Sequence, residues 1–592
     1  MTISANFSNV RPSLLLDFAN EQALDPRITF TRSTTGAYYN GYSSAVAEQN
    51  LFTYSQQFTN AVWSPSSVTT VDNSVVAPDG TTTAALVTCS AGTATKYLRQ
   101  LVTLSANGAL SFYAKAGTGS YIQIIDTSNG ARFCNFDLSL GVLGTAGGQA
   151  TGTITSVGSG WYRCSVVFSA FNGSATAYGI YFVDSASATY ATTATTTGTF
   201  NLWGAQLEQR STVTAYTATT TTAITNYIPV LQTGAINQAR FDHDPVLGTS
   251  LGLLIEQQST NLLLQSQFAS GWTIGGGTPT LSLNTDIAPD GTLTASKLIG
   301  SSSSGNQSIY QAVTTTAVAN TQSVYAKAGE QPYLAISFGA GASTDGAYFN
   351  LSTGALGTLK SGTTATITSV GNGWYRCTAT RTLSAGTNYA QFEVHSADNQ
   401  GAWTGNGYSG IYIFGASLEA LPFPTSYIPT VASQVTRSAD SAIMTGTNFS
   451  SWYNQAEGTI YGEGTSISTT ISTLANTGVD GVLSQNSISI GHTGTGTNSN
   501  FYNSGVLQAN FAGTGSWSLT ATNKMSIAVK NNDSCSAVNG TIGTTDTVCV
   551  VPFGINAIYI GGVVSQPFNG AIKKIAYYPI RVSNAQLQAL TG

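Results

Sequence analysis

Apolar and polar residues alternate along most of this chain, which is the period of a β-strand with one buried face. In WYRCSVVF (161–168), every second residue from Tyr162 to Phe168 falls on one face, and Trp161 and Arg163 fall on the other. Segments of this kind recur along the chain and are separated by PDG, GSG and NG turns. The pattern predicts an antiparallel, all-β protein.

A second segment, FNLWGAQLEQ (200–209), has the same period. Counting by two places Trp203, Ala205 and Leu207 on one face of the expected strand. The segment 411–420 repeats the pattern with Phe414 at the place of Trp203.

The sequence contains one domain twice. ITSVGSGWYRC (154–164) recurs as ITSVGNGWYRC (367–377) with ten of eleven positions identical, 213 residues further on. YAKAG at 113–117 recurs at 325–329, and APDGT at 77–81 recurs at 288–292. Offsets that agree this closely indicate a duplicated domain rather than a solenoid of short repeats. Neither copy contains an amphipathic helix pattern, so each is predicted to be a two-sheet sandwich of the jelly-roll kind.

The region 441–592 differs from both copies and closes with a helix signal. Ser583 and Gln586 have the spacing of a capping box, and Leu587 and Leu590 give the following turns an apolar side. A last strand followed by one short C-terminal helix is expected.

Composition agrees with β-structure and excludes some partners. Charged residues are 8% of the chain, hydrophobic residues are 42%, and the net charge is −5. Helical bundles need more charge on their surfaces, and a phosphate-tracking nucleic-acid binder needs basic clusters that this chain lacks. No apolar run is long enough for a membrane helix, and the N-terminus does not match a secretory signal, so we expect no membrane insertion.

The six cysteines do not have the spacing of a disulfide framework or a zinc site. Cys535 and Cys549 flank a predicted hairpin and could pair across it. We expect two free thiols there, in a protein made in a reducing cytosol.

Several segments resemble parts of tailed-bacteriophage virion proteins, such as tail fibres and other surface appendages. They are RPSLLLDFANEQALDPRITFTRSTTGAYYN (11–40), ARFDHDPVLGTSLGLLIEQQSTNLL (239–263) and the two GWYRC copies. The segment 538–590 resembles the end of a laminin-G or concanavalin A-like sandwich. The resemblance implies two jelly rolls, one concanavalin A-like sandwich and a small N-terminal module.

This resemblance also gives the expected domain boundaries. The N-terminal anchoring module covers 1–45, repeat 1 covers 46–223, repeat 2 covers 259–440, and the C-terminal sandwich covers 441–592. In relatives, the piece at 11–40 is followed closely by the piece that here lies in 224–258. The segment 224–258 is therefore either a linker or the second half of a split N-terminal module with repeat 1 inserted.

Motifs for catalysis are weak, and we expect a protein that is not an enzyme. The G-x-S-x-G at 248–252 and the G-x-G-x-x-G at 405–410 lack the strand-to-helix context that either motif needs. The E-x-D-x-E pattern of concanavalin-like glycosidases is absent, and Glu457 and Glu463 are expected to be solvated. Glu208 and Glu419 hold equivalent positions in the two copies, which favours a structural hydrogen-bond acceptor over an active-site carboxylate.

No cofactor is expected, although calcium is possible. Sandwich loops bind calcium through carboxylate and carbonyl oxygens, so Asp79, Asp290, Asp242 and Asp244 are candidate ligands. Aspartate as a turn former is the favoured alternative.

Carbohydrate recognition uses aromatic rings beside amide and hydroxyl groups. Trp403 and Tyr190 lie in equivalent polar loops of the two copies and are the candidate glycan contacts. A large exposed aromatic ring leaves apolar area uncovered unless a ligand covers it. The alternative is that both rings fold back onto the sandwich or onto a neighbouring subunit.

The resemblance to phage appendages implies a virion surface protein, assembled in the host cytoplasm, that binds host-envelope polysaccharide as a fibre or spike. The resemblance implies a homotrimer and attachment to other virion proteins through the N-terminal module. Two alternatives stay open: a head fibre or capsid decoration protein with a structural role, and a polysaccharide depolymerase.

Overall fold

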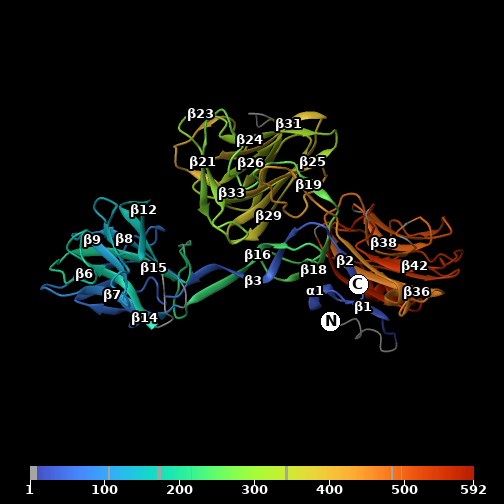
Figure 1. The fold of residues 1–592 in the computed structure, drawn as a ribbon, viewed down its shortest axis with the longest axis horizontal. Coiled ribbons are helices and arrows are strands. Elements are labelled where there is room, and N and C mark those ends of the chain that lie inside the picture. Colours follow the sequence, from blue (N-terminus) through green and yellow to red (C-terminus); the bar gives the residue numbers. More distant parts are fainter. Residues whose placement is uncertain are drawn as a thin grey trace. The chain divides into compact units, whose positions relative to one another are not determined.

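The computed structural model describes residues 10–104, 107–169, 175–211, 213–214, 216–339, 345–479, 481, 484–494, 496–519, 521–563 and 565–592. The chain forms two compact units, one made of Val46–Tyr227 and the other of Met1–Ala45 with Ile228–Gly592. The described part is nearly all β-structure, and its helices α1 (Phe18–Glu21), α2 (Gly446–Ser450) and α3 (Asn584–Thr591) are short (Figure 1). The predicted fold class, all-β with tandem antiparallel β-sandwiches, is confirmed.

Repeat 1 is a sandwich of two six-stranded antiparallel sheets, in the orders β11-β10-β9-β14-β7-β4 and β12-β13-β8-β15-β6-β5. Phe112, Ile124, Cys164 and Ile180 are fully buried between them. The first sheet contains β4 (Ser64–Ser66), β7 (Lys96–Thr103), β9 (Tyr121–Asp126), β10 (Phe133–Asp137), β11 (Val142–Ala146) and β14 (Ala175–Phe182), and the second contains β5 (Val68–Val75), β6 (Ala84–Cys89), β8 (Gly108–Ala116), β12 (Ala150–Gly158), β13 (Trp161–Phe168) and β15 (Thr199–Glu208).

Repeat 2 has the same strand order, with sheets β28-β27-β26-β31-β24-β20 and β29-β30-β25-β33-β22-β21. This topology is the structural counterpart of the sequence duplication. An additional hairpin pairs β23 (Ser304–Gly305) with β32 (Trp403–Thr404). The sandwich strands are β20 (Thr273–Ile274), β21 (Thr280–Asp286), β22 (Ala295–Ile299), β24 (Ser308–Thr315), β25 (Ala319–Ala328), β26 (Tyr333–Ser337), β27 (Gly346–Asn350), β28 (Ala355–Leu359), β29 (Thr363–Gly371), β30 (Trp374–Thr382), β31 (Gly386–His395) and β33 (Gly410–Glu419).

The C-terminal sandwich also has two antiparallel sheets. One has the order β17-β18-β45-β36-β41-β42-β43 with β1 also paired to β45, and the other has the order β2-β35-β44-β37-β38-β39-β40. Their bounds are β1 (Leu14–Leu16), β2 (Thr29–Thr31), β17 (Phe241–His243), β18 (Ser250–Ile255), β35 (Ser441–Thr445), β36 (Glu457–Ser466), β37 (Ile471–Gly478), β38 (Ser487–Thr493), β39 (Gly496–Asn503), β40 (Val506–Asn510), β41 (Asn523–Lys530), β42 (Cys535–Val538), β43 (Thr541–Ile542), β44 (Ala557–Ile560) and β45 (Gly570–Tyr578).

The N-terminal segment differs from the expected small module, because its strands belong to this C-terminal sandwich. β1 and β18 pair along the same edge of β45, and β2 pairs with β35 in the opposite sheet. Leu14, Leu16 and Phe30 are buried in the same core as Ile572. A segment this short cannot bury its apolar residues alone, so it completes a larger core instead.

Residues of 1–45 also contact residues of 224–258, as a split module requires. β3 (Gly36–Asn50) pairs with β16 (Ile224–Gly234) in a two-stranded ribbon. The backbone N–H of Arg32 donates to Asn237 Oδ1 at 3.0 Å, and the backbone N–H of Tyr39 donates to Asp242 Oδ1 at 2.7 Å. The anchoring role of residues 1–45 stays a prediction.

Two expectations about individual strands have different outcomes. Cys164, Val166 and Phe168 are in the repeat 1 core while Trp161 packs in a separate outer cluster, as the alternation predicts. Trp203 does not share a face with Ala205 and Leu207: it joins Trp161 in that outer cluster. The pairing of β15 with β8 shifts register between Trp203 and Gln206, where Gly204 has φ +60°, and such a bulge reverses which side chains point inward.

The C-terminal helix α3 is confirmed. Ser583 Oγ accepts from the backbone N–H of Gln586 at 3.3 Å, and Gln586 Oε1 accepts from the backbone N–H of Ser583 at 2.8 Å. Leu587 is buried beside Cys535 in a small cluster. Cys535, Cys549 and the other four cysteines are free and buried.

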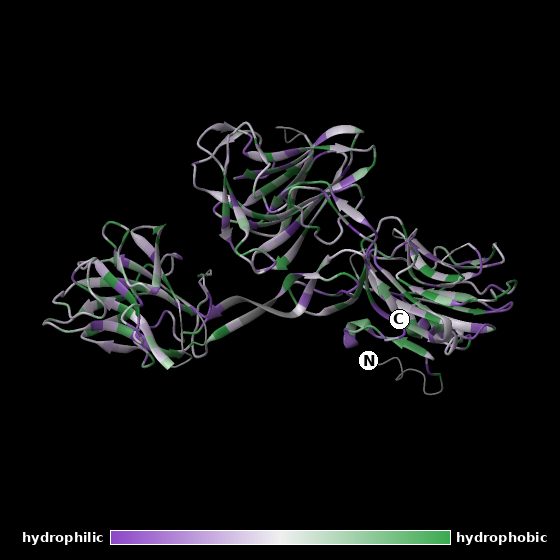
Figure 2. Ribbon diagram, in the orientation of Figure 1, coloured by the Kyte–Doolittle hydropathy of each residue, from purple (hydrophilic) through white to green (hydrophobic). Residues whose placement is uncertain are grey.

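Hydrophobic residues lie on strands in each sandwich rather than in one long apolar segment (Figure 2). Within the described residues, no helix is both long and apolar enough to span a membrane.

Candidate functional site

The most distinctive surface of repeat 1 is the outer face of the sheet that contains β7 and β14. Leu98 of β7 and Ile180 of β14 point into the core, so Tyr97, Arg99 and Tyr181 point away from it. Tyr181 lies directly opposite Tyr97 in the antiparallel register. We call Tyr97, Arg99, Tyr181 and Tyr190 the tyrosine–arginine face.

The rings and the guanidinium on this face are in contact. The ring centroids of Tyr97 and Tyr181 are 4.9 Å apart with planes inclined by 31°. Arg99 Cζ lies 4.3 Å from the centroid of the Tyr97 ring, and Arg99 Nη1 donates to Tyr181 Oη at 3.4 Å. The stacked guanidinium is held in place by a cation–π contact while it remains partly exposed.

A glycine makes room for this arrangement. Gly179 lies opposite Arg99 in the register, and a Cβ added there would be 2.6 Å from Arg99 Cβ and 2.2 Å from the Leu98 carbonyl oxygen. No other residue fits at this position without moving the arginine or the strand.

Tyr190 reaches the same face from the loop between β14 and β15. Its hydroxyl donates to the Asp126 carbonyl oxygen at 3.2 Å, and its ring meets Phe133 edge-on at 6.0 Å. Gln123 Oε1 accepts from the Ala191 backbone N–H at 2.9 Å and fixes the loop. Burial raises the pKa of the Tyr190 hydroxyl above its ordinary value.

The local charge at this face is positive. Asp126 forms an ion pair with Arg132 at 2.8 Å, and both side chains are nearly fully buried. Among the described residues, no carboxylate forms an ion pair with Arg99. The guanidinium therefore remains available to an anionic or hydrogen-bonding ligand.

Repeat 2 has a different outer face on the corresponding sheet. Glu393 Oε1 accepts from Ser337 Oγ at 3.0 Å and from Gln391 Nε2 at 2.7 Å, and Glu393 Oε2 is 3.3 Å from His395 Nε2. Glu393, Gln391 and His395 are fully buried. The two copies share a fold and differ in the chemistry of this face.

The glycan-contact candidates take up packing positions. Trp403 packs against the core of repeat 2, and its Nε1–H donates to the Val394 carbonyl oxygen at 3.0 Å. This is the fold-back arrangement that the sequence left open. Tyr190 also packs on its sandwich but lies beside Tyr97 and Arg99, and its contact with a glycan stays a prediction.

Three residues of the face were not found from sequence. Tyr97, Arg99 and Tyr181 belong to alternating segments, KYLRQLVT and ATAYGIYF, whose two faces both contain apolar and polar residues. The sequence did contain one signal for this face. Tyr97 and Arg99 are two residues apart on one strand, and that spacing places both side chains on the same face.

The calcium candidates are engaged in local hydrogen bonds. Asp79 Oδ1 accepts from the backbone and hydroxyl of Thr81, and Asp290 does the same with Thr292. Both are turn-forming contacts.

The other two calcium candidates also have backbone partners. Asp244 Oδ1 accepts from the backbone N–H groups of Val246 and Leu247. Burial raises the pKa of Asp242 to about 6. Within the described residues, no group of three or more histidine, cysteine, aspartate or glutamate side chains is placed to hold a metal. Calcium binding stays a prediction.

The residues of the weak catalytic motifs lie in structural positions. Ser250 begins strand β18 and pairs with His243 in an antiparallel sheet. Glu208 accepts from the backbone and hydroxyl of Thr214, and Glu419 accepts from those of Thr425, as expected of structural acceptors.

The two acids near the start of the last sandwich also have protein partners. Glu457 Oε2 accepts from the backbone N–H of Arg581 at 3.0 Å. Glu463 Oε2 accepts from Tyr461 Oη at 3.1 Å.

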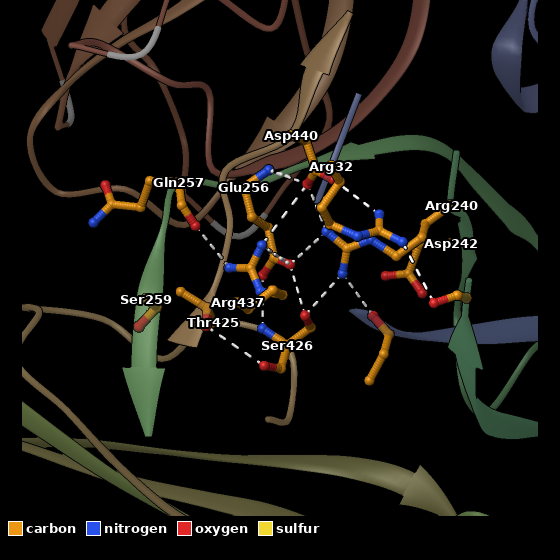
Figure 3. Close-up of polar contacts among 12 residues, drawn as sticks. Arg32, Arg240, Asp242, Glu256, Gln257, Ser259, Thr425, Ser426, Arg437 and Asp440 are labelled. Carbon is orange, nitrogen blue, oxygen red and sulfur yellow. Dashed lines mark hydrogen bonds and ion pairs between the residues drawn. The ribbon is translucent and has the colours of Figure 1, made fainter. Parts of the chain in front are cut away.

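A buried ion network joins distant segments within the larger unit (Figure 3). Asp440 pairs with Arg32 at 3.0 Å and with Arg240 at 2.6 Å. Glu256 pairs with Arg240 at 2.8 Å and with Arg437 at 3.4 Å. Burial alone would raise the pKa of Glu256, but Arg437 and Arg240 outweigh it and hold the pKa at about 2. Because each carboxylate is paired with two arginines, the network holds these segments of the chain together.

Comparisons with known proteins give fold-level similarities. No protein-family model and no curated protein matches the chain. The CBM40 module of the Ruminococcus gnavus IT-sialidase, solved with α2,3-sialyllactose, is 19% identical, covers 24% of this chain and 88% of its own, and has a TM-score of 0.22. The Trypanosoma rangeli sialidase is 16% identical over 25% of each chain, with a TM-score of 0.19. The LG1-3 region of the laminin α2 chain is 8% identical over 83% of this chain and 97% of its own, with a TM-score of 0.18. Similarities at this level do not assign a function to the chain.

Proposed function

We propose that this chain is a non-catalytic glycan-binding protein. The observation that carries the proposal is the tyrosine–arginine face of repeat 1, where Tyr97 and Tyr190 present partly exposed rings beside the Arg99 guanidinium. Aromatic rings stack on the apolar faces of sugars, and guanidinium and hydroxyl groups bond sugar oxygens. The hydrogen bonds that fix the Tyr190 loop organise these groups before a ligand arrives, which lowers the entropy lost on binding.

We also propose a setting on the surface of a tailed-bacteriophage virion, as a fibre or spike assembled in the host cytoplasm. Support comes from the sequence resemblance of 11–40, 239–263 and the two GWYRC copies to modules of such proteins. In this setting the chain is a homotrimer that attaches to other virion proteins through residues 1–45 and binds host-envelope polysaccharide. Several shallow sites on one particle would raise avidity by about 10²-fold or more.

A head fibre or capsid decoration protein is the alternative with a structural role. It shares the fold and the resemblance, and it differs in having no glycan ligand. A depolymerase is the second alternative. The described carboxylates give little support to a catalytic role, because Glu393, Glu256 and Glu419 are buried and already paired or hydrogen-bonded.

One experiment separates the three functions. Purified full-length protein is incubated with isolated host-envelope polysaccharide, and both retention of the polymer and its chain length are followed. We expect retention with unchanged length. Shortening of the polymer would replace the proposal with the depolymerase, and failure to retain polysaccharide or whole cells would favour the capsid-decoration role.

A further inference from the structure

The tyrosine–arginine face has a positive charge that the corresponding face of repeat 2 lacks. This difference indicates which class of ligand repeat 1 would bind. Arg99 is partly exposed on the surface of a chain in which only 8% of residues are charged. Its contacts in the structure are the Tyr97 ring and the Tyr181 hydroxyl, neither of which neutralises it. An arginine whose guanidinium lies over an aromatic ring can still direct the N–H groups that are not bonded to Tyr181 toward a planar anion.

Resting on the proposed function, we infer that repeat 1 binds acidic polysaccharide, with a sugar carboxylate paired to Arg99. The carboxylate would accept two parallel hydrogen bonds from the guanidinium, the geometry in which such pairs are strongest. The adjoining sugar would lie against the part of the Tyr97 ring that stays exposed beside Arg99 and Tyr181. Leu101, 68% exposed and two residues beyond Arg99 on the same face of β7, extends the apolar surface for the next sugar of the polymer.

The register of the two copies allows a position-by-position comparison. The core pair Leu98 and Ile180 of repeat 1 corresponds to Ile309 and Phe392 of repeat 2. Tyr310 therefore stands at the position of Arg99.

The same correspondence places Ser308 at the position of Tyr97 and Glu393 at that of Tyr181. Repeat 2 thus has a carboxylate where repeat 1 has a tyrosine, and no arginine nearby on this strand pair. Ser308 and Glu393 are fully buried, so repeat 2 presents neither an arginine nor an exposed ring at these two positions, and an anionic sugar has no equivalent partner there.

The edge of the sheet beside Arg99 supplies hydroxyl groups that suit a polysaccharide. Strand β4 pairs with β7 so that Ser64 lies opposite Arg99 and Ser66 lies opposite Tyr97. Ser64 is exposed, so its hydroxyl can form a hydrogen bond with a hydroxyl group of the bound sugar.

The test compares Arg99→Gln with a matched control in the full chain. Lys115→Gln removes the same charge from the same repeat, but Lys115 lies on β8 of the other sheet, where its ammonium donates to the Ser159 carbonyl oxygen. The probes are polygalacturonate, alginate and polysialic acid, each offered as the native polymer and after chemical reduction of its carboxyl groups. Unfolding temperatures of both variants are measured to show that they fold.

We expect wild type and Lys115→Gln to bind at least one native polymer about tenfold or more tightly than its reduced form, and this preference to weaken with salt. Arg99→Gln should lose the preference, and Arg99→Lys should keep part of it. Equal affinity for native and reduced polymers, no binding of any native polymer, or an Arg99→Gln variant that matches wild type would each overturn the inference. If retention of host-envelope polysaccharide depends on Tyr97 but not on Arg99, the inferred pairing of a sugar carboxylate with Arg99 is wrong, whereas the proposed glycan binding still holds.

Discussion

The role of a side chain in this molecule depends on which face of its strand it occupies. Arg99 and Leu98 are neighbours in sequence, yet Leu98 is fully buried in the core while Arg99 lies on a ring at the surface. Glu256 and Asp440 are buried as completely as core residues, and they are tolerated because three arginines surround them.

Glu256 gives a prediction at this scale. Glu256→Gln leaves Arg437 and Arg240 short of negative charge, so we expect a loss of about 3 kcal/mol in the free energy of unfolding at pH 7. Because Glu256 has a pKa of about 2 in the folded chain against 4.5 ordinarily, its contribution is fully present above about pH 4.5 and is lost as the pH falls toward 2. Urea unfolding from pH 7 to pH 2 measures both effects.

The control for this substitution is Glu21→Gln. Glu21 is exposed, so its change should stay within about 0.5 kcal/mol. A Glu256→Gln variant as stable as this control, or one that keeps the full acid dependence of wild type, would contradict the role assigned to the network.

At the scale of elements, sequence alternation predicted the strands and the duplication well. The prediction failed where a β-bulge interrupts the alternation of the two faces. Trp161 was placed on the correct face, whereas Trp203 was not, because the bulge at Gly204 reverses the alternation and nothing in a count by two reveals it.

The candidate site was predicted only in part, for a similar reason. Tyr190 was found as a loop aromatic, but Tyr97 and Arg99 were not, since both faces of KYLRQLVT mix apolar and polar residues. Only the pairing with β14 shows which face is covered. The ion network was also missed, because three of its ion pairs join residues more than 180 positions apart in the sequence.

The strands β1 and β2 lead to a second prediction. Deletion of residues 1–31 removes Leu14, Leu16 and Phe30 from the C-terminal core and uncovers an edge of β45. We expect the C-terminal sandwich to lose about 5 kcal/mol or more, since burial of each large apolar side chain contributes about 1.5 to 3 kcal/mol. Repeat 1, with a core of its own, should be unaffected.

Hydrogen exchange resolved by mass spectrometry distinguishes the two regions. We expect faster exchange in β36, β44 and β45 and unchanged exchange in β8 and β13. Unchanged exchange in the C-terminal strands would show that residues 1–31 are not part of that sandwich. A truncation of this kind therefore cannot by itself test anchoring to a particle, because we expect it to destabilise the C-terminal sandwich as well.

For the whole molecule, duplication of a domain has provided two scaffolds whose interiors agree and whose outer faces differ. Asn50 Nδ2 donates to the Ala205 and Thr217 carbonyl oxygens, and Asn261 Nδ2 donates to the corresponding Ala416 and Ile428 oxygens. The networks that maintain the fold are thus the same in both copies. The chemistry of the outer face is free to diverge, and the account places glycan binding on repeat 1.

The most direct test of this account is a calorimetric titration of the full chain with a polysaccharide that it retains. Tyr97→Ala is compared with Tyr310→Ala, which removes a partly exposed tyrosine from the corresponding face of repeat 2. We predict that Tyr97→Ala weakens binding by about tenfold or more and that Tyr310→Ala stays within about twofold of wild type. Equal losses from both substitutions, or a loss from Tyr310→Ala alone, would contradict the assignment of the site to repeat 1.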